Sequence, residues 1–192
     1  MRIQVLKLIT LLFVFAFSSH AFATITVFWD GTGDGIADTS IPLPPPGDQP
    51  FTIDLYADIS DDGHGGLLSW GGLAQFSASA ATATNSTIDP NWFVVGKNDI
   101  SPGVVDLVAG RIGSGLSGQQ LLASIQFTAT GPFVLSLVDH GPGFDDFVAE
   151  DGFVYDGSFG EPTIQVVPIP GAVLFMLTGL AGLIGFNRRK SS

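Results

Sequence analysis

The chain has 192 residues, enough for one domain of ordinary size plus targeting segments, and two domains would each lack a core. Cysteine is absent, which excludes disulfides, thiolate zinc sites, iron–sulfur clusters and cysteine nucleophiles. Charged residues make up 13% of the chain against 45% hydrophobic residues, with 25 glycines and 12 prolines. This balance favours a turn-rich β protein over a coiled coil or a charge-rich disordered chain.

The first 23 residues are organised as a signal peptide. Arg2 and Lys7 precede an apolar run from Leu8 to Phe17, and Ala21 and Ala23 supply the small residues that signal peptidase requires. Ten apolar residues at about 1.5 Å each reach only about half of a hydrocarbon core of about 30 Å, too short for a retained anchor. We therefore predict export, with signal peptidase cutting after Ala23.

Short alternating runs separated by turn signals fill the middle of the chain. From Phe51 to Ile59 every second residue is apolar and those between are Thr, Asp or Tyr, as in a half-buried strand. Further strands are predicted at residues 25–29, 73–80, 92–95, 104–109, 121–130, 133–139, 147–155 and 163–167. About nine strands at this spacing predict an all-β, antiparallel β-sandwich or jelly roll over residues 24–165. Residues 41–47 are proline-rich and predict a stiff connection, because proline cannot join a sheet interior.

Five of these segments follow one another in an order that matches a known fold. They are residues 51–59, a glycine-led strand at 67–78, the run Ile88-Asp89-Pro90-Asn91-Trp92-Phe93, the Leu-Ala-x-Ile-x-Phe strand within 121–129, and residues 133–139. The order resembles that of cohesin-like domains of the cellulose-binding and cohesin superfamily. Because the matching residues are mostly packing residues, the resemblance implies a fold and carries over no partner-binding residues.

The C-terminal segment, residues 166–192, has three parts. Val167-Pro168-Ile169-Pro170 precedes Gly171, an uncharged apolar segment covers residues 171–186, and a basic tail occupies residues 188–190. An apolar segment followed at once by basic residues is typical of a membrane stop with a cytoplasmic tail. Sixteen residues at about 1.5 Å each span about 24 Å, a minimal transmembrane helix. The prolines fix an extended, helix-incompatible segment that a processing enzyme can grip.

This tripartite tail resembles the PEP-CTERM sorting signal in its Val-Pro-x-Pro-(Ala/Gly) variant, with Ile169 where the commonest form has Glu. The resemblance implies recognition and processing by an integral-membrane exosortase in a Gram-negative bacterium that makes extracellular polysaccharide. The residues that the resemblance assigns to sorting are Val167, Pro168, Ile169, Pro170, Gly171, Arg188, Arg189 and Lys190. A plain single-pass anchor is the alternative.

Charge is distributed unevenly along the chain. The segment from Ile25 to Val167 holds all 18 acidic residues and only two of the seven basic ones, Lys97 and Arg111, so its formal net charge is −16. Such a surface repels nucleic acid and anionic lipid and attracts divalent cations or basic partners. Solubility through net charge is the simpler interpretation of most individual carboxylates.

One acidic loop is a candidate calcium site. Asp30, Thr32, Asp34 and Asp38 stand at positions one, three, five and nine of a loop with glycine at position six, much like the start of a calcium-binding loop. The twelfth position is Ile41, where such a loop needs a bidentate glutamate. A plain Asp/Gly turn after the first strand is the alternative.

Large aromatic residues are candidates for contacts with carbohydrate. Tyr56, Trp70 and Trp92 could form a platform on which sugar rings stack, and Tyr56 is placed on the outer face of its predicted strand. The alternative is that the tryptophans fill the core of the sandwich.

The sequence gives little support to catalysis. After removal of the signal peptide the remaining histidines are His64 and His140, both in glycine-rich turns, and no Gly-x-Ser-x-Gly elbow accompanies them. We therefore predict a non-enzymatic protein with a structural or adhesive role in exopolysaccharide or biofilm, which passes through the inner membrane to the cell surface or the medium. The alternatives are a carbohydrate-binding module, with extracellular polysaccharide as partner, and a secreted hydrolase.

Overall fold

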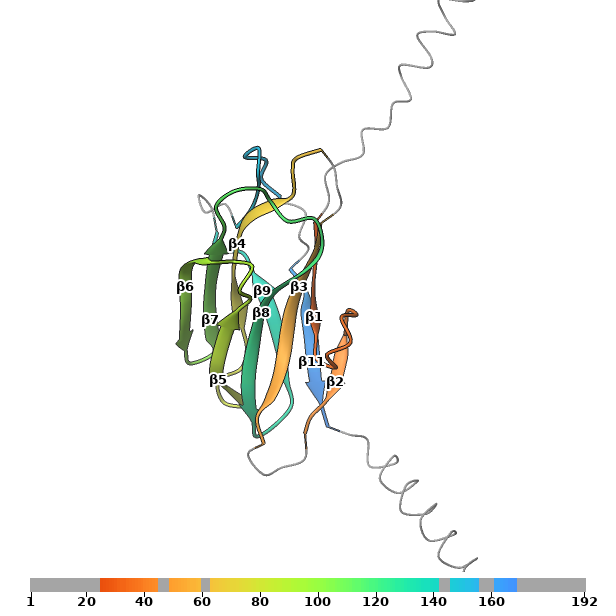
Figure 1. Cartoon of the computed structure of the whole chain (residues 1–192). Helices are drawn as coiled ribbons and strands as arrows, with labels where there is room; N and C mark the ends of the chain where they lie inside the picture. The colour runs from red at the N-terminus through yellow and green to blue at the C-terminus, as the bar shows by residue number, and fades with distance from the viewer. Residues whose placement is uncertain (1–24, 45–48, 60–62, 142–145, 156–160, 169–192) are drawn as a thin grey trace, which may run out of the picture.

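The computed structural model describes residues 25–44, 49–59, 63–141, 146–155 and 161–168, which form a sandwich of two β-sheets (Figure 1). The predicted signal peptide and the predicted membrane helix at 171–186 lie outside these residues. Of the sorting residues, Val167 and Pro168 lie within them. In the described part of the chain no helix is long and apolar enough to cross a membrane.

Eleven strands occur within the described residues. In chain order they are β1 (Ile25–Asp30), β2 (Ser40–Pro42), β3 (Phe51–Ile59), β4 (Leu67–Gln75), β5 (Ala81–Ile88), β6 (Val94–Ser101), β7 (Val104–Gly110), β8 (Gly118–Ala129), β9 (Phe133–Val138), β10 (Phe147–Ala149) and β11 (Thr163–Val167).

The strands divide into a sheet of four and a sheet of seven. The smaller sheet has the order β1-β3-β8-β5, and the larger has the order β2-β11-β9-β4-β7-β6, with β10 paired to β4 beside this path. The pairing of β2 with β11 is parallel, and the other pairings between these strands are antiparallel. The predicted all-β antiparallel sandwich is confirmed, with eleven strands rather than about nine.

Alternation along β3 positions the core as the sequence predicts. Ile53, Leu55, Ala57 and Ile59 are buried, while the residues between them are exposed or half-buried. Buried apolar side chains from both sheets meet in one layer.

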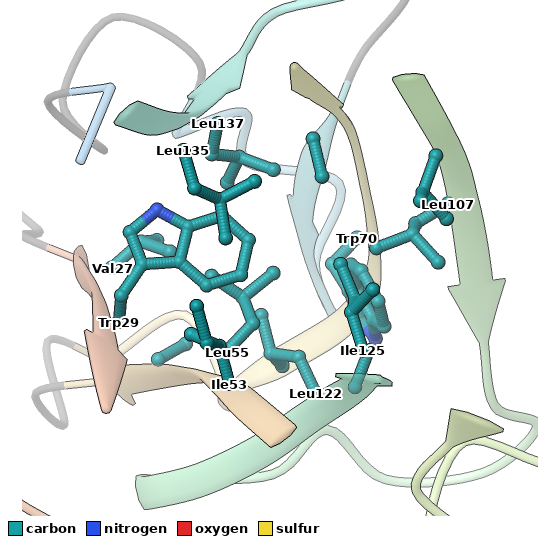
Figure 2. Close-up of a cluster of buried hydrophobic side chains, with 14 of the residues drawn as sticks. Val27, Trp29, Ile53, Leu55, Trp70, Leu107, Leu122, Ile125, Leu135 and Leu137 are labelled. Carbon is teal, nitrogen blue, oxygen red and sulfur yellow. The ribbon is translucent and has the colours of Figure 1, made fainter. Parts of the chain in front are cut away.

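Three tryptophans, Trp29, Trp70 and Trp92, fill this layer, and each is only 1% exposed. In Figure 2 the indole of Trp29 lies in the same cluster as Leu135 and Leu55, and Trp70 lies nearer Leu107. Trp92 packs edge-on against Trp70, with ring centroids 6.3 Å apart. Full burial of such rings removes a large apolar surface from water and dominates the stability of the core.

The strand at β5 was not predicted, because its alternation is weak. Only Ala81, Ala83 and Ile88 face the core, and two of these three side chains are small. The intervening threonines, asparagine and serine are exposed or half-buried, so the segment has the composition of a polar loop. Its place is set by pairing with β8 instead.

The predicted strand at 73–80 is displaced toward the N-terminus, to β4 at Leu67–Gln75. Gly71 and Gly72 lie inside the strand because neighbours occupy the space of their missing side chains: a Cβ on Gly72 would lie 2.6 Å from Leu137 Cδ1. After Gln75 the chain turns, and the amides of Ala80 and Ala81 both donate to the Ser77 carbonyl at 3.0 Å.

Other boundaries also differ from the prediction. β6 continues to Ser101 instead of ending at residue 95, because it pairs with β7 along its length. The strand predicted at 147–155 is reduced to β10, after which the chain turns so that Val154 forms an isolated bridge with Val148. The proline-rich connection contributes a three-residue edge strand, β2, which agrees with exclusion of proline from a sheet interior.

Candidate functional sites on the sandwich

Asp30, at the end of β1, organises the loop that follows it. Its Oδ1 accepts hydrogen bonds from the amides of Thr32 at 2.9 Å and Gly33 at 2.6 Å, and its Oδ2 accepts one from Gly35 at 2.7 Å. Asp38 Oδ2 accepts the Thr32 amide at 3.2 Å. Burial alone would raise the pKa of Asp30, but the amide donors outweigh it and hold the pKa below its ordinary value.

The four residues of the candidate calcium loop therefore lie together, but the carboxylates of Asp30, Asp34 and Asp38 serve the backbone. Asp34 Oδ1 accepts the Ile36 amide at 2.9 Å, in the manner of an Asx turn. Among the residues that the structure describes, no group of three or more His, Asp or Glu side chains is placed to hold a metal ion. The arrangement fits an Asp/Gly turn in which the carboxylates bind backbone amides.

The predicted aromatic platform does not form from the three residues proposed for it. Trp70 and Trp92 point into the core and are 1% exposed, so neither offers a ring face to a sugar. Trp92 Nε1 instead donates to the Leu121 carbonyl at 2.9 Å. Tyr56 is placed differently: it is half-buried on the outer face of β3.

Tyr56 belongs to a second aromatic pair, on the outer face of the four-stranded sheet. Its ring stacks on Phe28 of β1, with centroids 5.6 Å apart and an angle of 12° between the planes. Exposed Thr52 and Asp58 lie on the same face of β3. Burial raises the pKa of the Tyr56 phenol, and the nearby carboxylates, led by Asp54, raise it further, so the hydroxyl stays neutral.

A histidine held between two aspartates lies on the outer face of the seven-stranded sheet. His140 Nε2 lies 2.9 Å from Asp106 Oδ1, and its Nδ1 lies 2.5 Å from Asp146 Oδ1. The His140 amide also donates to Asp146 Oδ2 at 2.8 Å. Lys97 Nζ completes the cluster at 2.8 Å from Asp106 Oδ2. We call these four residues the His140 cluster.

Two features of the fold position the His140 cluster. Asp106 alternates with buried residues along β7 and therefore faces outward. Gly71 of β4 leaves room for the loop after β9, because a Cβ there would lie 2.9 Å from Asp146 Oδ1. The Asp146 side chain is consequently 0% exposed and that of His140 only 8% exposed.

Ionisation of the cluster follows from these contacts. Burial lowers the pKa of His140, but its hydrogen bonds to Asp106 and Asp146 outweigh burial and raise the pKa above its ordinary value. Burial raises the pKa of Asp106, but the bonds from Lys97 and His140 bring it below the ordinary value. The imidazolium form of His140 has one N–H to donate to Asp106 and one to donate to Asp146, so the charged histidine can form both hydrogen bonds at once.

The cluster has the geometry of a structural clamp. Both ring nitrogens of His140 lie against carboxylates, so neither is positioned to take a proton from a hydroxyl nucleophile. The other described histidine, His64, lies 2.6 Å from Asp151 Oδ2 and stacks on Phe153. The sequence alone does not predict the His140 cluster, because its members come from β6, β7 and the segment after β9 and no sequence motif joins them.

The sorting residues begin inside the sandwich. Val166 is buried and Val167 pairs with Pro42 of β2, so the first two residues of the segment assigned to the tail are part of β11. The Val167 carbonyl also accepts the Leu43 amide at 2.6 Å. Ile169, Pro170, Gly171, Arg188, Arg189 and Lys190 lie outside the described residues.

No protein-family model matches the sequence, and no curated protein matches it significantly. Several solved structures have a similar fold. One is the cohesin module of a family 33 glycoside hydrolase from Clostridium perfringens, with a TM-score of 0.53 and 16% identity over 76% of this chain and 96% of that one. Another is a type III cohesin of the ScaE cell-surface anchoring scaffoldin from Ruminococcus flavefaciens, with a TM-score of 0.52 and 10% identity over 77% and 89% of the two chains.

A third similar structure is the OlpC cohesin of Clostridium thermocellum, solved in a cohesin–dockerin complex. Its TM-score is 0.53, with 9% identity over 76% of this chain and 95% of that one. At such identities the likeness concerns the fold alone. The predicted cohesin-like β-sandwich is thereby confirmed: the chain has the fold of a cohesin module.

Removal of His140 tests the clamp through its pH dependence. The pKa of His140 is higher in the folded protein than in the unfolded chain. The stabilisation that charged His140 gives the fold is therefore fully present below its unfolded pKa of about 6.5, and it is lost as pH rises through its folded pKa. His140→Gln should therefore cost on the order of 3 kcal/mol in unfolding free energy at pH 5.5, and less at pH 9. Urea denaturation at both pH values measures this.

His64→Gln is the matched control, since it breaks a histidine–aspartate pair whose side chains are 28% and 50% exposed. Such an exposed pair contributes about 0 to 1 kcal/mol. An equal effect of the two substitutions, or a His140→Gln effect that grows with pH, would contradict the clamp.

Proposed function

We propose that the chain is an exported, non-catalytic adhesive or structural module of the bacterial cell envelope, sorted by an exosortase and active in exopolysaccharide or biofilm. One observation carries the proposal: a cohesin-like sandwich stands between a segment organised as a signal peptide and a segment that resembles a PEP-CTERM tail. A module with this fold and these flanks is suited to present a binding surface outside the cell.

The solved neighbours support a role in binding another macromolecule. One belongs to a cell-surface anchoring scaffoldin, and another was solved in complex with a dockerin. The residues of this chain that the structure describes add no constellation for catalysis, since the buried histidine of the His140 cluster serves as a clamp. We therefore propose protein–protein adhesion or scaffolding as the broad class of activity.

The end of the sandwich supports processing of the tail. β11 is the last strand among the residues that the structure describes, and its Val167 is also the first residue of the proposed sorting motif. A cut beyond Pro168 would leave all of the described strands with the exported product. The proposed sequence of events is cleavage by signal peptidase, retention in the inner membrane through residues 171–186, and processing by exosortase.

Fractionation of the native host tests the sorting proposal. In a strain with the exosortase the extracellular or outer-surface protein should lack the mass of the segment beyond the Pro168 region, whereas in a strain without it the intact tail should stay in the membrane fraction. Intact-mass measurement distinguishes the two forms.

Replacing both Pro168 and Pro170 by alanine should block processing, because the extended segment can then become helical.

Pro132→Ala is the control for that substitution, because Pro132 lies in the turn between β8 and β9. An uncleaved tail in the membrane fraction of both strains would make the protein a plain anchored envelope protein.

A carbohydrate-binding module is the second candidate, and the stacked pair of Phe28 and Tyr56 favours it. These rings lie on an outer sheet face that also presents Thr52 and Asp58, so an apolar patch has polar neighbours, as in flat sugar sites. Polysaccharide from the host is the ligand that this interpretation predicts.

Tyr56→Ala should weaken retention of the protein on immobilised host exopolysaccharide about tenfold, because one ring of the stacking pair is lost. Phe153→Ala removes an aromatic ring that is 38% exposed outside this face and serves as control. Equal retention of wild type and Tyr56→Ala would remove this candidate.

A further inference from the structure

The edge of the larger sheet at β6 is open along most of its length. β6 is the last strand in the sheet order and, within the described residues, pairs only with β7. Seven of its eight residues are exposed, Asn98 being the exception. An exposed edge strand presents unpaired N–H and C=O groups, which makes it a template for another extended chain. We call the side of Val94–Ser101 that faces away from β7 the β6 edge.

The usual protections of an edge strand are weak here. β6 contains no proline, and its lysine, Lys97, is turned back over its own sheet to Asp106, 2.8 Å away. The opposite end of the same sheet shows the contrast, since β2 has only three residues and ends in Pro42. A register shift between Val95 and Lys97 perturbs one part of β6, and the residues from Lys97 to Ser101 pair regularly with β7.

The β6 edge is held in place by the other sheet. Asn98 points inward, where its Nδ2 donates to the Ser86 carbonyl of β5 at 3.0 Å and its Oδ1 accepts from the Ser86 hydroxyl. This link between Asn98 and Ser86 fixes β6 in place. It leaves other residues of β6 accessible, since Val95 is 54% exposed and Ile100 is 41% exposed. A preorganised edge loses little conformational entropy when a partner binds.

An apolar cavity adjoins the end of the β6 edge. It has a volume of about 280 Å³ and lies between the start of β5 and the turn after β6. Phe76, Ala81, Ala83, Ile100 and Pro102 are among the residues that line it. No charged side chain lines it, so it suits a large apolar side chain.

The charge beside this edge selects the partner. Asp99 stands directly opposite Asp106 on β7, and the Asp106 carboxylate already has Lys97 and His140 as partners. Asp99 makes no ion pair within the described residues. A cation placed opposite Asp99 would give this carboxylate an ion-pair partner, and the formal charge of −16 between Ile25 and Val167 would attract a basic chain from a distance.

We propose that the β6 edge is a strand-addition site for an extended basic segment of another protein. The segment pairs antiparallel with β6, places a lysine or arginine opposite Asp99, and places the residue that precedes this cation, a large apolar one, beside Ile100 at the cavity. Backbone hydrogen bonds supply affinity, while the cation and the apolar side chain supply specificity. The inference goes beyond the proposed function and does not depend on processing of the tail.

The test uses two synthetic peptides of about eight residues, the length of β6. One alternates lysine with phenylalanine or valine, and the other has glutamate in place of each lysine. The full 192-residue chain, held in a non-ionic detergent, is titrated with each labelled peptide by fluorescence polarisation. The lysine peptide should bind and the glutamate peptide should not, and hydrogen exchange should slow in residues 94–101 when the lysine peptide is present.

Two variants test the specific contacts. Asp99→Lys should weaken binding of the lysine peptide at least about tenfold and create binding of the glutamate peptide, because the charge at the pairing position is reversed. Ile100→Ser should weaken binding several-fold by removing apolar contact at the cavity. Their controls are Asp58→Lys, the same charge change on the other sheet, and Val134→Ser, the loss of an aliphatic side chain that is 48% exposed on β9.

The proposal is overturned if the lysine peptide does not bind at millimolar concentration, or if it slows exchange elsewhere and not in residues 94–101. It is also overturned if Asp58→Lys weakens binding as much as Asp99→Lys, since attraction would then be a property of net charge alone. Self-association of the chain without peptide, abolished by Asp99→Lys, would also overturn it, because the occupant would then be a second copy of this chain. The sorting assay is unaffected by any of these outcomes, so failure of one proposal is distinguishable from failure of the other.

Discussion

Packing of two sheet faces around three buried indoles is the constraint on which the rest of the structure depends. Trp29, Trp70 and Trp92 come from β1, from β4 and from the segment before β6, so each joins a different part of the chain to the common layer. Trp29 Nε1 donates to the Pro162 carbonyl at 2.9 Å, which links the first strand to the approach of the last. The chain has no cysteine, so its fold is stabilised by this packing and not by disulfides.

Because the core takes these rings, the side chains available for contact with other molecules lie on the outer surfaces. The four-stranded sheet presents a mostly polar face with one stacked aromatic pair, and the seven-stranded sheet presents the His140 cluster and the β6 edge. The His140 cluster fixes the loop after β9 against β4 and β7, and its Lys97 is also the charge that would otherwise guard the β6 edge. Lys97 therefore belongs both to the His140 cluster and to the strand that forms the β6 edge.

The parts of this architecture that sequence reasoning predicted are those with a strong local signal. Alternation over residues 51–59 predicted both a strand and its inner face, since large apolar side chains mark every second position. β5 has no such signal, because two of its inward residues are alanines and its position depends on β8. In the Asp30 loop the amides of Gly33 and Gly35 donate to the Asp30 carboxylate, and spacing alone cannot tell whether a carboxylate faces a metal or backbone amides. The His140 cluster and the β6 edge arise from pairing between distant strands, which a single sequence does not reveal.

The burial of all three tryptophans is the central claim of this account, and quenching of their fluorescence tests it most directly. The predicted result is a blue-shifted emission that acrylamide and iodide quench little in the folded protein, and that becomes red-shifted and fully quenchable in urea. Red-shifted emission that iodide quenches readily without urea would contradict the account, since it would put indole rings on the surface, as an aromatic sugar platform requires.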